Sequence, residues 1–213
     1  MDRVRLVCTA CALLLGVLNM TSARAEERTI VDEWNNVEVP PPPKLEPVTL
    51  DTKSTAILVL DILQQNCIAA RRPRCAASVP RITRLLDNGR SKAVLIAYSV
   101  FPQAAASDIL AEVASGAGEL VVTSGPDKFL GTELEKFLRD KGVKTVVIVG
   151  SAAHGAVLYT AGAAAFRGFE VVVAVDGISA DTTYAEQYTT WHLANAPIIA
   201  NHVKLTRCDL VRF

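Results

Sequence analysis

Residues 146–179 place the tightest constraint on how this chain can fold. Their sequence, VVIVGSAAHGAVLYTAGAAAFRGFEVVVAVDGIS, has two apolar, β-branched runs that flank an alanine-rich segment. The runs are typical of strands buried on both faces, and the segment between them is typical of a helix. Two strands joined by a helix belong to a parallel sheet, because parallel neighbours need a long crossover. Ligands of such sheets bind beyond the carboxyl ends of the strands, which here means the turn at residues 150–156.

Strands and helices alternate along the rest of the chain as well. Apolar runs predict strands at residues 55–60, 92–99, 119–123, 145–149, 170–175 and 203–206. Helical spacing of apolar residues predicts helices at residues 76–90, 103–114, 132–141, 156–167 and 184–195, of which the second has the weakest pattern. This order predicts one α/β domain over residues 51–213, a three-layer α/β/α sandwich around a mostly parallel six-stranded sheet of Rossmann-like type.

The first 25 residues have the features of a cleavable signal peptide. A basic start precedes an apolar run at residues 6–18, and Ala23 and Ala25 provide small residues for a cut after Ala25. The run is shorter than the roughly 20 residues of a membrane span, and the alternative is an uncleaved anchor or a buried helix. We therefore expect an exported protein, periplasmic or secreted, without membrane association once the signal peptide is removed.

Residues 26–50 are predicted to form an extended, proline-rich arm. The four consecutive prolines at residues 40–43 hold the chain in a polyproline conformation. Trp34 and the valines that follow it favour an arm docked on the domain or on a partner subunit. The alternative is a flexible leader.

Composition argues against several classes of function. The 213 residues carry a formal net charge of zero and no basic stripe, which argues against a nucleic-acid partner. His154, His192 and His202 are the three histidines and lack metal-ligand spacing, so no metal is expected. The sequence has no glycine-rich phosphate loop, and no cofactor is expected.

Cys67 and Cys75 are close enough in sequence to form a disulfide in an oxidising compartment. Two free buried thiols are the alternative, because the sequence does not give the Cα–Cα distance that a bridge requires. Both hypotheses stay open at this point.

Asp61 is the sharpest candidate for a functional residue. It directly follows the predicted strand at residues 55–60, where a carboxylate is costly to bury unless it is paired or bound. The alternative is a loop acid that caps the next turn. A Ser/His/Asp set of Ser99, His154 and Asp61 is not favoured, because the sequence around Ser99 lacks a nucleophile elbow.

Three segments give the chain its resemblance to a known family. They are TAILVLDILQQN, FLGTELEKFLRDKGVKTVVIVG and GSAAHGAVLYTAGAAAFRGFEVVVAVDGIS. With them, residues 54–206 resemble the isochorismatase-like superfamily, also called the cysteine hydrolases. The resemblance implies the α/β sandwich, a hydrolase that acts on a small molecule, and association into a homo-oligomer.

The resemblance also implies an Asp, Lys and Cys triad, of which this chain keeps one member. The Asp corresponds to Asp61, whereas the Lys position holds Thr123 and the Cys position holds Ala156. Alanine has no thiol, so a covalent acyl-enzyme is excluded unless another cysteine substitutes, and Cys67 is the near candidate. Lys128 follows Thr123 by five residues, and its ammonium either returns to Asp61 or remains solvated.

A second branch of the family, the true isochorismatases, cleaves a vinyl ether without a cysteine. The segment Ala153-His154-Gly155-Ala156 is similar to the pattern of that branch. The resemblance then implies that Asp61 acts as general acid or base and that His154 donates a hydrogen bond to the substrate. The alternative for His154 is a solvent-facing residue at a helix start. The family pattern also implies a cis peptide bond between Ser151 and Ala152.

These arguments predict a hydrolase of a small organic molecule that uses acid/base chemistry centred on Asp61. The competing hypothesis is a catalytically inactive protein that binds a small molecule. The predicted catalytic residues are Asp61, Lys128 and His154. The predicted substrate-binding residues are Thr123, Ser151, Ala152, Gly155 and Ala156.

Overall fold

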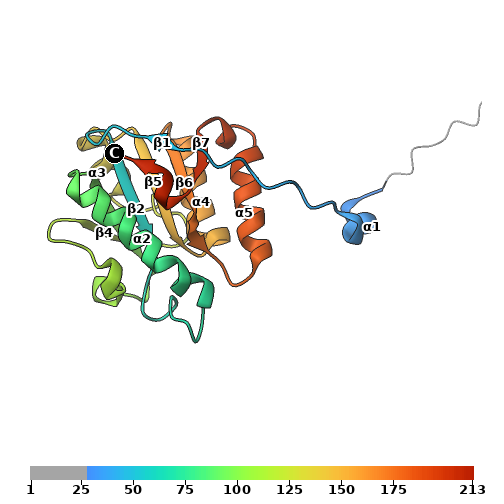
Figure 1. Cartoon of the computed structure of the whole chain (residues 1–213), viewed down its shortest axis with the longest axis horizontal. Helices are drawn as coiled ribbons and strands as arrows, with labels where there is room; N and C mark the ends of the chain where they lie inside the picture. Colours follow the sequence, from blue (N-terminus) through green and yellow to red (C-terminus); the bar gives the residue numbers. More distant parts are fainter. Residues whose placement is uncertain (1–27) are drawn as a thin grey trace, which may run out of the picture. The chain divides into compact units, whose positions relative to one another are not determined.

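The computed structural model describes residues 28–213, so the predicted signal peptide at residues 1–25 lies outside the described residues. A parallel, six-stranded sheet forms the centre of the fold (Figure 1). Its strand order is β4-β3-β2-β5-β6-β7. The bounds are β2 Thr55–Leu60, β3 Leu95–Val100, β4 Leu120–Thr123, β5 Thr145–Ser151, β6 Glu170–Ser179 and β7 Val203–Thr206. The predicted sheet is thereby confirmed, and every pairing within it is parallel.

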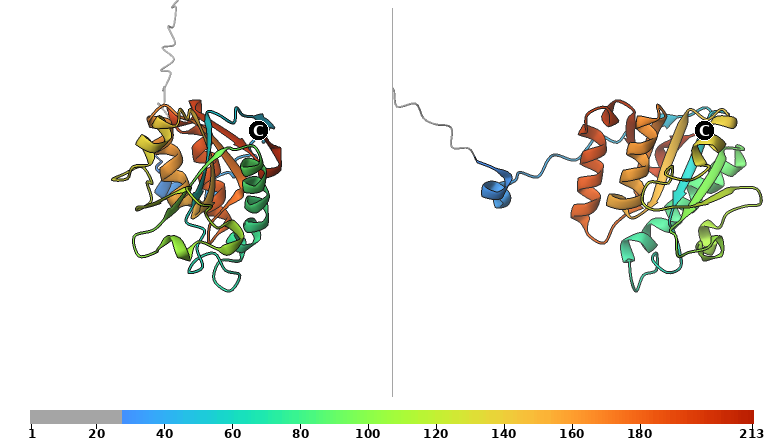
Figure 2. Two further views of the ribbon diagram at one scale, coloured as in Figure 1. Left: turned by 90° about the vertical axis from the view of Figure 1, so that its left-hand side faces the viewer. Right: turned by 180° about the vertical axis from the view of Figure 1, so that it is seen from behind.

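Helices cover both faces of the sheet, as the two turned views in Figure 2 show. On one face α2 (Pro73–Ser91) buries its apolar side against β2, β3, β5 and β6. On the other face lie α3 (Leu134–Asp140), α4 (Leu158–Phe166) and α5 (Thr183–Asn195). Every residue of β2 is buried, which explains why its sequence is a continuous apolar run and not an alternating one. The three-layer prediction is confirmed.

The predicted helix at residues 103–114 is wrong. The chain there forms two short 3₁₀ helices, η2 (Ala106–Asp108) and η3 (Ala111–Val113). The Asp108 carboxylate accepts a hydrogen bond from the Ala105 backbone N–H, which favours a turn over a continuing helix. Val113 is fully buried, so the short turns still contribute to the core.

Strand β6 extends four residues beyond its predicted end at residue 175. Its pairing with β5 is irregular between Ile148 and Gly150, after which Gly150 pairs with Ile178. Asp176 lies within this irregular stretch, where its carboxylate accepts a hydrogen bond from the Cys208 backbone N–H at 2.7 Å. The strand was predicted to end before Asp176 because a charged residue is unusual inside a buried strand. The irregular pairing accommodates this acid, and the strand continues beyond it.

A second, two-stranded sheet was not predicted. Strand β1 (Val48–Thr49) pairs in parallel with β8 (Val211–Arg212), next to the amino ends of the main strands. Glu46 is held on β7, since its carbonyl accepts a hydrogen bond from Thr206 Oγ1 at 2.7 Å. The last residues of the predicted arm are therefore extended but belong to the domain.

By its contacts the chain divides into two units, residues 1–39 and residues 40–213. Within the described part of the first unit, α1 (Ile30–Glu33) has a capping box between Thr29 and Asp32, and η1 (Trp34–Asn36) follows it. The Trp34 side chain is exposed. No helix among residues 28–213 is long and apolar enough to cross a membrane.

Candidate active site

The carboxyl end of β2 places Asp61 between two neighbouring strands. Leu60 pairs with Ser99 of β3 and with Gly150 of β5, so the ends of three strands meet at this point. The backbone of Asp61 has φ of 53°, a left-handed conformation that aspartate tolerates better than most residues. This turn directs the side chain into the protein, where Asp61 is only 7% exposed.

Both oxygens of the Asp61 carboxylate accept hydrogen bonds from side chains. Ser99 Oγ donates to Oδ1 at 2.8 Å, and Lys128 Nζ donates to Oδ2 at 2.8 Å. The hydrogen bonds of the following turn are made by Asn66 instead, whose side chain bonds the Leu63 backbone N–H and the Asp61 carbonyl. The geometry therefore differs from that of a capping loop acid. It also differs from a Ser/His/Asp set, because His154 is exposed.

Lys128 is fully buried and held from several sides. Its Nζ also donates to the Ser124 carbonyl at 3.1 Å, while its backbone N–H donates to Thr160 Oγ1 and its carbonyl accepts from Thr132 Oγ1. A buried ammonium is costly unless it is paired, and Asp61 is its counter-ion. The lysine side chain therefore takes the path back to Asp61 and does not remain solvated. Lys128, in the turn after β4, therefore supplies the ammonium group that the family's lysine would have supplied at the position of Thr123.

A pocket of about 340 Å³ opens beside this pair. Five of the predicted site residues line it: Asp61, Lys128, Ser151, Ala152 and Ala156. Thr123, His154 and Gly155 are not among the lining residues, and the first two are exposed. The catalytic role of His154 and the substrate contacts of Thr123 and Gly155 stay predictions.

The turn after β5 forms one wall of the pocket. Gly150 has φ of 140°, and a Cβ at this position would lie 2.2 Å from the Leu60 carbonyl oxygen. The Ser151–Ala152 peptide bond is cis, as the family pattern implies. The chain then enters η4 (Ala153–Val157), a π-helical turn in which the Ala152 carbonyl accepts from the N–H groups of Gly155 and Val157.

Sequence reasoning missed two arginines that line the pocket, Arg71 and Arg72. Arg72 makes an ion pair with Asp181 at 2.8 Å and donates to Ser151 Oγ at 3.4 Å. Arg71 bonds the Gln65 carbonyl at 2.7 Å and makes no ion pair within the described residues. Their place in the sequence could have indicated this role. Both lie in the loop between β2 and the next helix, and such a loop must lie at the carboxyl edge of the sheet.

The charges around the pocket do not cancel. Asp61 neutralises Lys128, and Asp181 neutralises Arg72. The charge of Arg71 is left over, since a carbonyl oxygen offers no formal charge. The pocket thus carries one excess positive charge, a feature that favours an anionic ligand.

No thiol reaches the pocket from the described residues. Cys67 forms a disulfide with Cys75, with a Cα–Cα distance of 5.1 Å, so it cannot substitute for the missing nucleophile. Cys208 is free but buried, and it does not line the pocket. Burial, followed by the nearby Asp176 carboxylate, raises the pKa of the Cys208 thiol and keeps it protonated.

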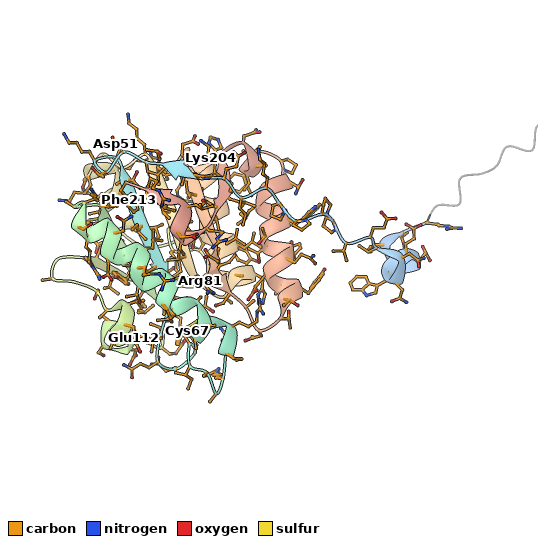
Figure 3. All side chains as sticks on the ribbon, viewed as in Figure 1. Asp51, Cys67, Arg81, Glu112, Lys204 and Phe213 are labelled. Atoms are coloured by element: carbon orange, nitrogen blue, oxygen red, sulfur yellow. A yellow bond between two sulfur atoms is a disulfide. The ribbon has the colours of Figure 1, made fainter. Side chains whose placement is uncertain are left out.

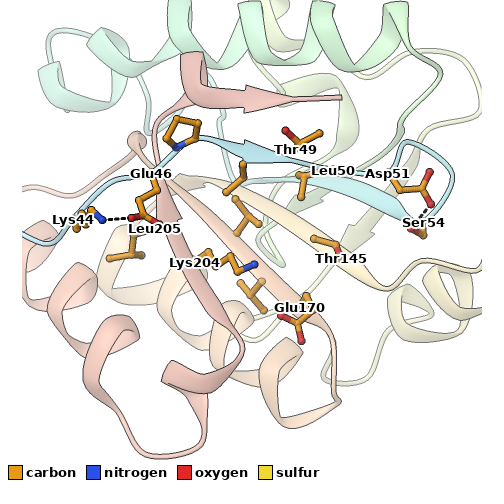
Figure 4. Close-up of a pocket in the computed structure, with 14 residues that line it drawn as sticks. Lys44, Glu46, Thr49, Leu50, Asp51, Ser54, Thr145, Glu170, Lys204 and Leu205 are labelled. Carbon is orange, nitrogen blue, oxygen red and sulfur yellow. Dashed lines mark hydrogen bonds and ion pairs between the residues drawn. The ribbon is translucent and has the colours of Figure 1, made fainter.

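A larger cavity of about 650 Å³ lies at the opposite edge of the sheet (Figure 4). It is lined by residues 44–51 and by the first residues of β5, β6 and β7. Its charged groups belong to exposed side chains such as the Lys44–Glu46 ion pair. The Asp61 pocket has the buried carboxylate and ammonium that chemistry requires, and it is the candidate active site.

Comparison with known proteins assigns the chain to a family. The model of the isochorismatase domain matches residues 55–202. The chain belongs to the isochorismatase family. The secreted isochorismatase effector Isc1 of Verticillium dahliae is 30% identical over 144 residues, which are 62% of this chain and 76% of that protein.

Solved structures of the isochorismatase family share the fold. An isochorismatase family protein from Desulfovibrio vulgaris has a TM-score of 0.66 and 20% identity, over 74% of this chain and 95% of that one. N-carbamoylsarcosine amidase from Thermoplasma acidophilum has a TM-score of 0.62 and 20% identity, over 73% of this chain and 97% of that one. Likeness at this level of identity concerns the fold, so activity has to be argued from the pocket.

Proposed function

We propose that this member of the isochorismatase family is an exported hydrolase that acts on a small organic anion without forming a covalent intermediate. The observation that carries the proposal is the buried Asp61–Lys128 ion pair, which lines the pocket. Ala156, which also lines the pocket, places a methyl group where the family has its nucleophile. Hydrolysis without a nucleophilic side chain requires a group that moves protons and a site that stabilises developing charge.

Asp61 is the proposed acid/base group. Its carboxylate takes a proton from the attacking water and returns it to the leaving group, so that one water is consumed for each bond cleaved. Lys128 and Ser99 fix the orientation of the carboxylate through the two 2.8 Å hydrogen bonds. For a vinyl ether the order is reversed: Asp61 first donates a proton to the vinyl carbon, the water that then adds returns a proton to Asp61, and the resulting hemiketal breaks its C–O bond to release the two products.

Backbone N–H groups in the turn between Ser151 and Ala156 are proposed to stabilise negative charge as it develops on the substrate. Three of these residues, Ser151, Ala152 and Ala156, line the pocket, which supports this role for the turn. Arg71 is proposed to hold the negative charge of the substrate, since the described residues offer it no acidic partner.

Export is part of the proposal. The sequence of residues 1–25 supports it, as does the name of the relative from Verticillium dahliae, which calls that protein secreted. The Cys67–Cys75 disulfide fits an oxidising compartment, where such bonds persist.

The test is a hydrolysis screen with the chain that begins at Glu26, against esters, amides and vinyl ethers that either carry or lack a carboxylate. We expect turnover of at least one anionic substrate, no turnover by Asp61→Asn, and no mass increase of the protein during turnover. A covalent adduct, or full activity of Asp61→Asn, would contradict the mechanism.

The alternative function is a small-molecule-binding protein without catalysis, favoured by the alanine at position 156. Thermal stabilisation by a substrate analogue, with no turnover of any member of the panel, would support this alternative and reject the hydrolase.

A further inference from the structure

A second pocket, of about 250 Å³, lies between α2 and the C-terminal segment of the chain. It shares no lining residue with the Asp61 pocket. Arg81 of α2, which is labelled in Figure 3, is one of the residues that line this pocket. The last residues of the chain run beside the same helix (Figure 1). We propose that this pocket binds a small molecule bearing a phosphate or sulfate group.

The pocket is lined by more positive than negative charge. Four arginines face two acids, and these residues are Arg81, Arg84, Arg207, Arg212, Asp176 and Asp209. Because each acid neutralises one arginine, two positive charges remain. A dianion compensates both, whereas a single carboxylate compensates one.

The two acids orient the arginines with which they are paired. Arg207 makes a two-pronged contact with Asp209, with both distances at 3.0 Å. Arg81 Nε donates to the Asp176 carbonyl at 2.9 Å and lies 3.6 Å from its carboxylate. The Asp176 carboxylate is itself fixed by the Cys208 backbone N–H. These guanidinium groups are therefore held in place before a ligand arrives.

The other two arginines carry the uncompensated charge. Arg212 donates to the carbonyls of Asp209 at 2.6 Å and Val211 at 3.5 Å, and neither acceptor has a formal charge. The Arg84 side chain makes no hydrogen bond or ion pair among residues 28–213 and is exposed. Guanidinium groups bind phosphate and sulfate oxygens through forked hydrogen bonds, so Arg84 and Arg212 are the proposed ligand contacts.

The size of the pocket limits the rest of the ligand. A volume of about 250 Å³ lies below the range typical of drug-sized ligands, so the anionic group can carry only a short body. The buried side chains of Leu85 and Val211 also line the pocket and offer that body an apolar surface. A phosphate or sulfate monoester of a small alcohol or phenol fits these features.

Binding of inorganic phosphate and of phenyl phosphate to the chain that begins at Glu26 tests the proposal, by calorimetry at constant ionic strength, with acetate as the monoanion. We expect saturable binding of both phosphates, tighter for phenyl phosphate, and at least tenfold weaker binding of acetate. The double variant Arg84→Gln/Arg212→Gln should weaken phosphate binding at least tenfold. Lys136→Gln/Lys141→Gln, two exposed lysines of α3 and its C-terminal end that do not line this pocket, removes the same charge as a matched control and should leave phosphate binding unchanged.

Equal affinity of the double variant and the unmodified chain would overturn the proposal, and so would an equal loss of binding in Lys136→Gln/Lys141→Gln. A titration with chloride at the same ionic strength should show no saturable binding, which supports a specific site. Chloride binding as tight as phosphate binding would contradict it. None of these results depends on turnover, so the proposal stands or falls independently of the hydrolase.

Discussion

At the scale of single residues, the Asp61–Lys128 pair links stability to chemistry. Lys128 has no exposed surface, and within residues 28–213 its ammonium is paired with one acid, Asp61. A buried ion pair contributes little net stability, yet removal of one partner leaves an uncompensated charge in the interior. Any substitution at the proposed catalytic group therefore changes folding as well as activity.

We predict that Asp61→Asn lowers the free energy of unfolding by about 3–5 kcal/mol, because the Lys128 ammonium loses its counter-ion. The double variant Asp61→Asn/Lys128→Met should recover most of that loss, since methionine fills a similar volume without a charge. Urea unfolding of the three proteins measures both effects. Equal free energies for the single and double variants would show that the pair is not a buried ion pair in solution.

Gly150 is the residue that allows β5 to pass close to β2. We predict that Gly150→Ala destabilises the fold by about 3 kcal/mol, because its Cβ would lie 2.2 Å from the Leu60 carbonyl oxygen and its φ of 140° is unfavourable for alanine. Gly125→Ala is the matched control, since a Cβ there would have no heavy atom within 4 Å and its φ is not positive. Thermal melts that show equal loss for both variants would contradict this account.

At the scale of elements, the loop from Asp61 to α2 carries both pocket arginines and is closed by the disulfide. Cys67 and Cys75 are eight residues apart, so the bond closes a short loop that contains Arg71 and Arg72. The Cys75 end lies in the first turn of α2, which anchors the loop to a long helix. The disulfide thereby holds the positive charge of the pocket in place.

We predict that Cys67→Ser/Cys75→Ser lowers the free energy of unfolding by about 2–3 kcal/mol, the loop-closure entropy expected for a loop of this length. The KM for an anionic substrate should rise more than kcat falls, because the arginines become less ordered while Asp61 keeps its place at the end of β2. Urea unfolding and steady-state kinetics check the two effects. An unchanged KM would remove the arginine loop from substrate binding.

The sequence predicted the strands well for a physical reason. A strand buried on both faces, such as β2, has to be apolar at every position, and such a run is easy to recognise. The helix predicted at residues 103–114 failed because a weak apolar spacing was satisfied by two separate turns that bury Val113. Local pattern does not distinguish these outcomes when the burial comes from distant contacts.

The site was predicted in part, for a related reason. Asp61 was found because a carboxylate at a buried strand end is exceptional. The path of Lys128 was left open, because a long side chain in a turn has many directions and only tertiary packing selects one. Arg71 and Arg72 were missed because arginines in a loop resemble ordinary surface residues until the fold brings the loop to the pocket.

At the scale of the whole molecule, residues 40–213 form one unit that includes the second half of the predicted arm. We predict that a chain beginning at Pro40 melts within about 2 °C of one beginning at Glu26, because no strand is lost. A chain beginning at Thr52 should melt several degrees lower, since β1 and the Glu46–Thr206 hydrogen bond are removed. Equal melting of all three would show that the β1–β8 sheet does not stabilise the domain.

Association into a homo-oligomer stays a proposal. The arm at residues 28–39 exposes Ile30, Val31, Trp34, Val37 and Val39, a high density of apolar side chains for a linker. Gel filtration of the chains that begin at Glu26 and at Pro40 examines the role of the arm. A smaller assembly for the second chain supports a bridging arm, and an unchanged elution volume rejects it.

The kcat/KM of the unmodified chain and of Asp61→Asn/Lys128→Met, measured side by side on an anionic substrate, tests the central claim most directly. The double variant removes the acid/base group without leaving a buried charge, and the urea unfolding described above shows whether it is folded under the assay conditions. The account predicts a fall of about 10²–10⁴-fold, the contribution typical of general acid/base catalysis. A kcat/KM within about threefold of the unmodified chain, well below that contribution, would contradict it.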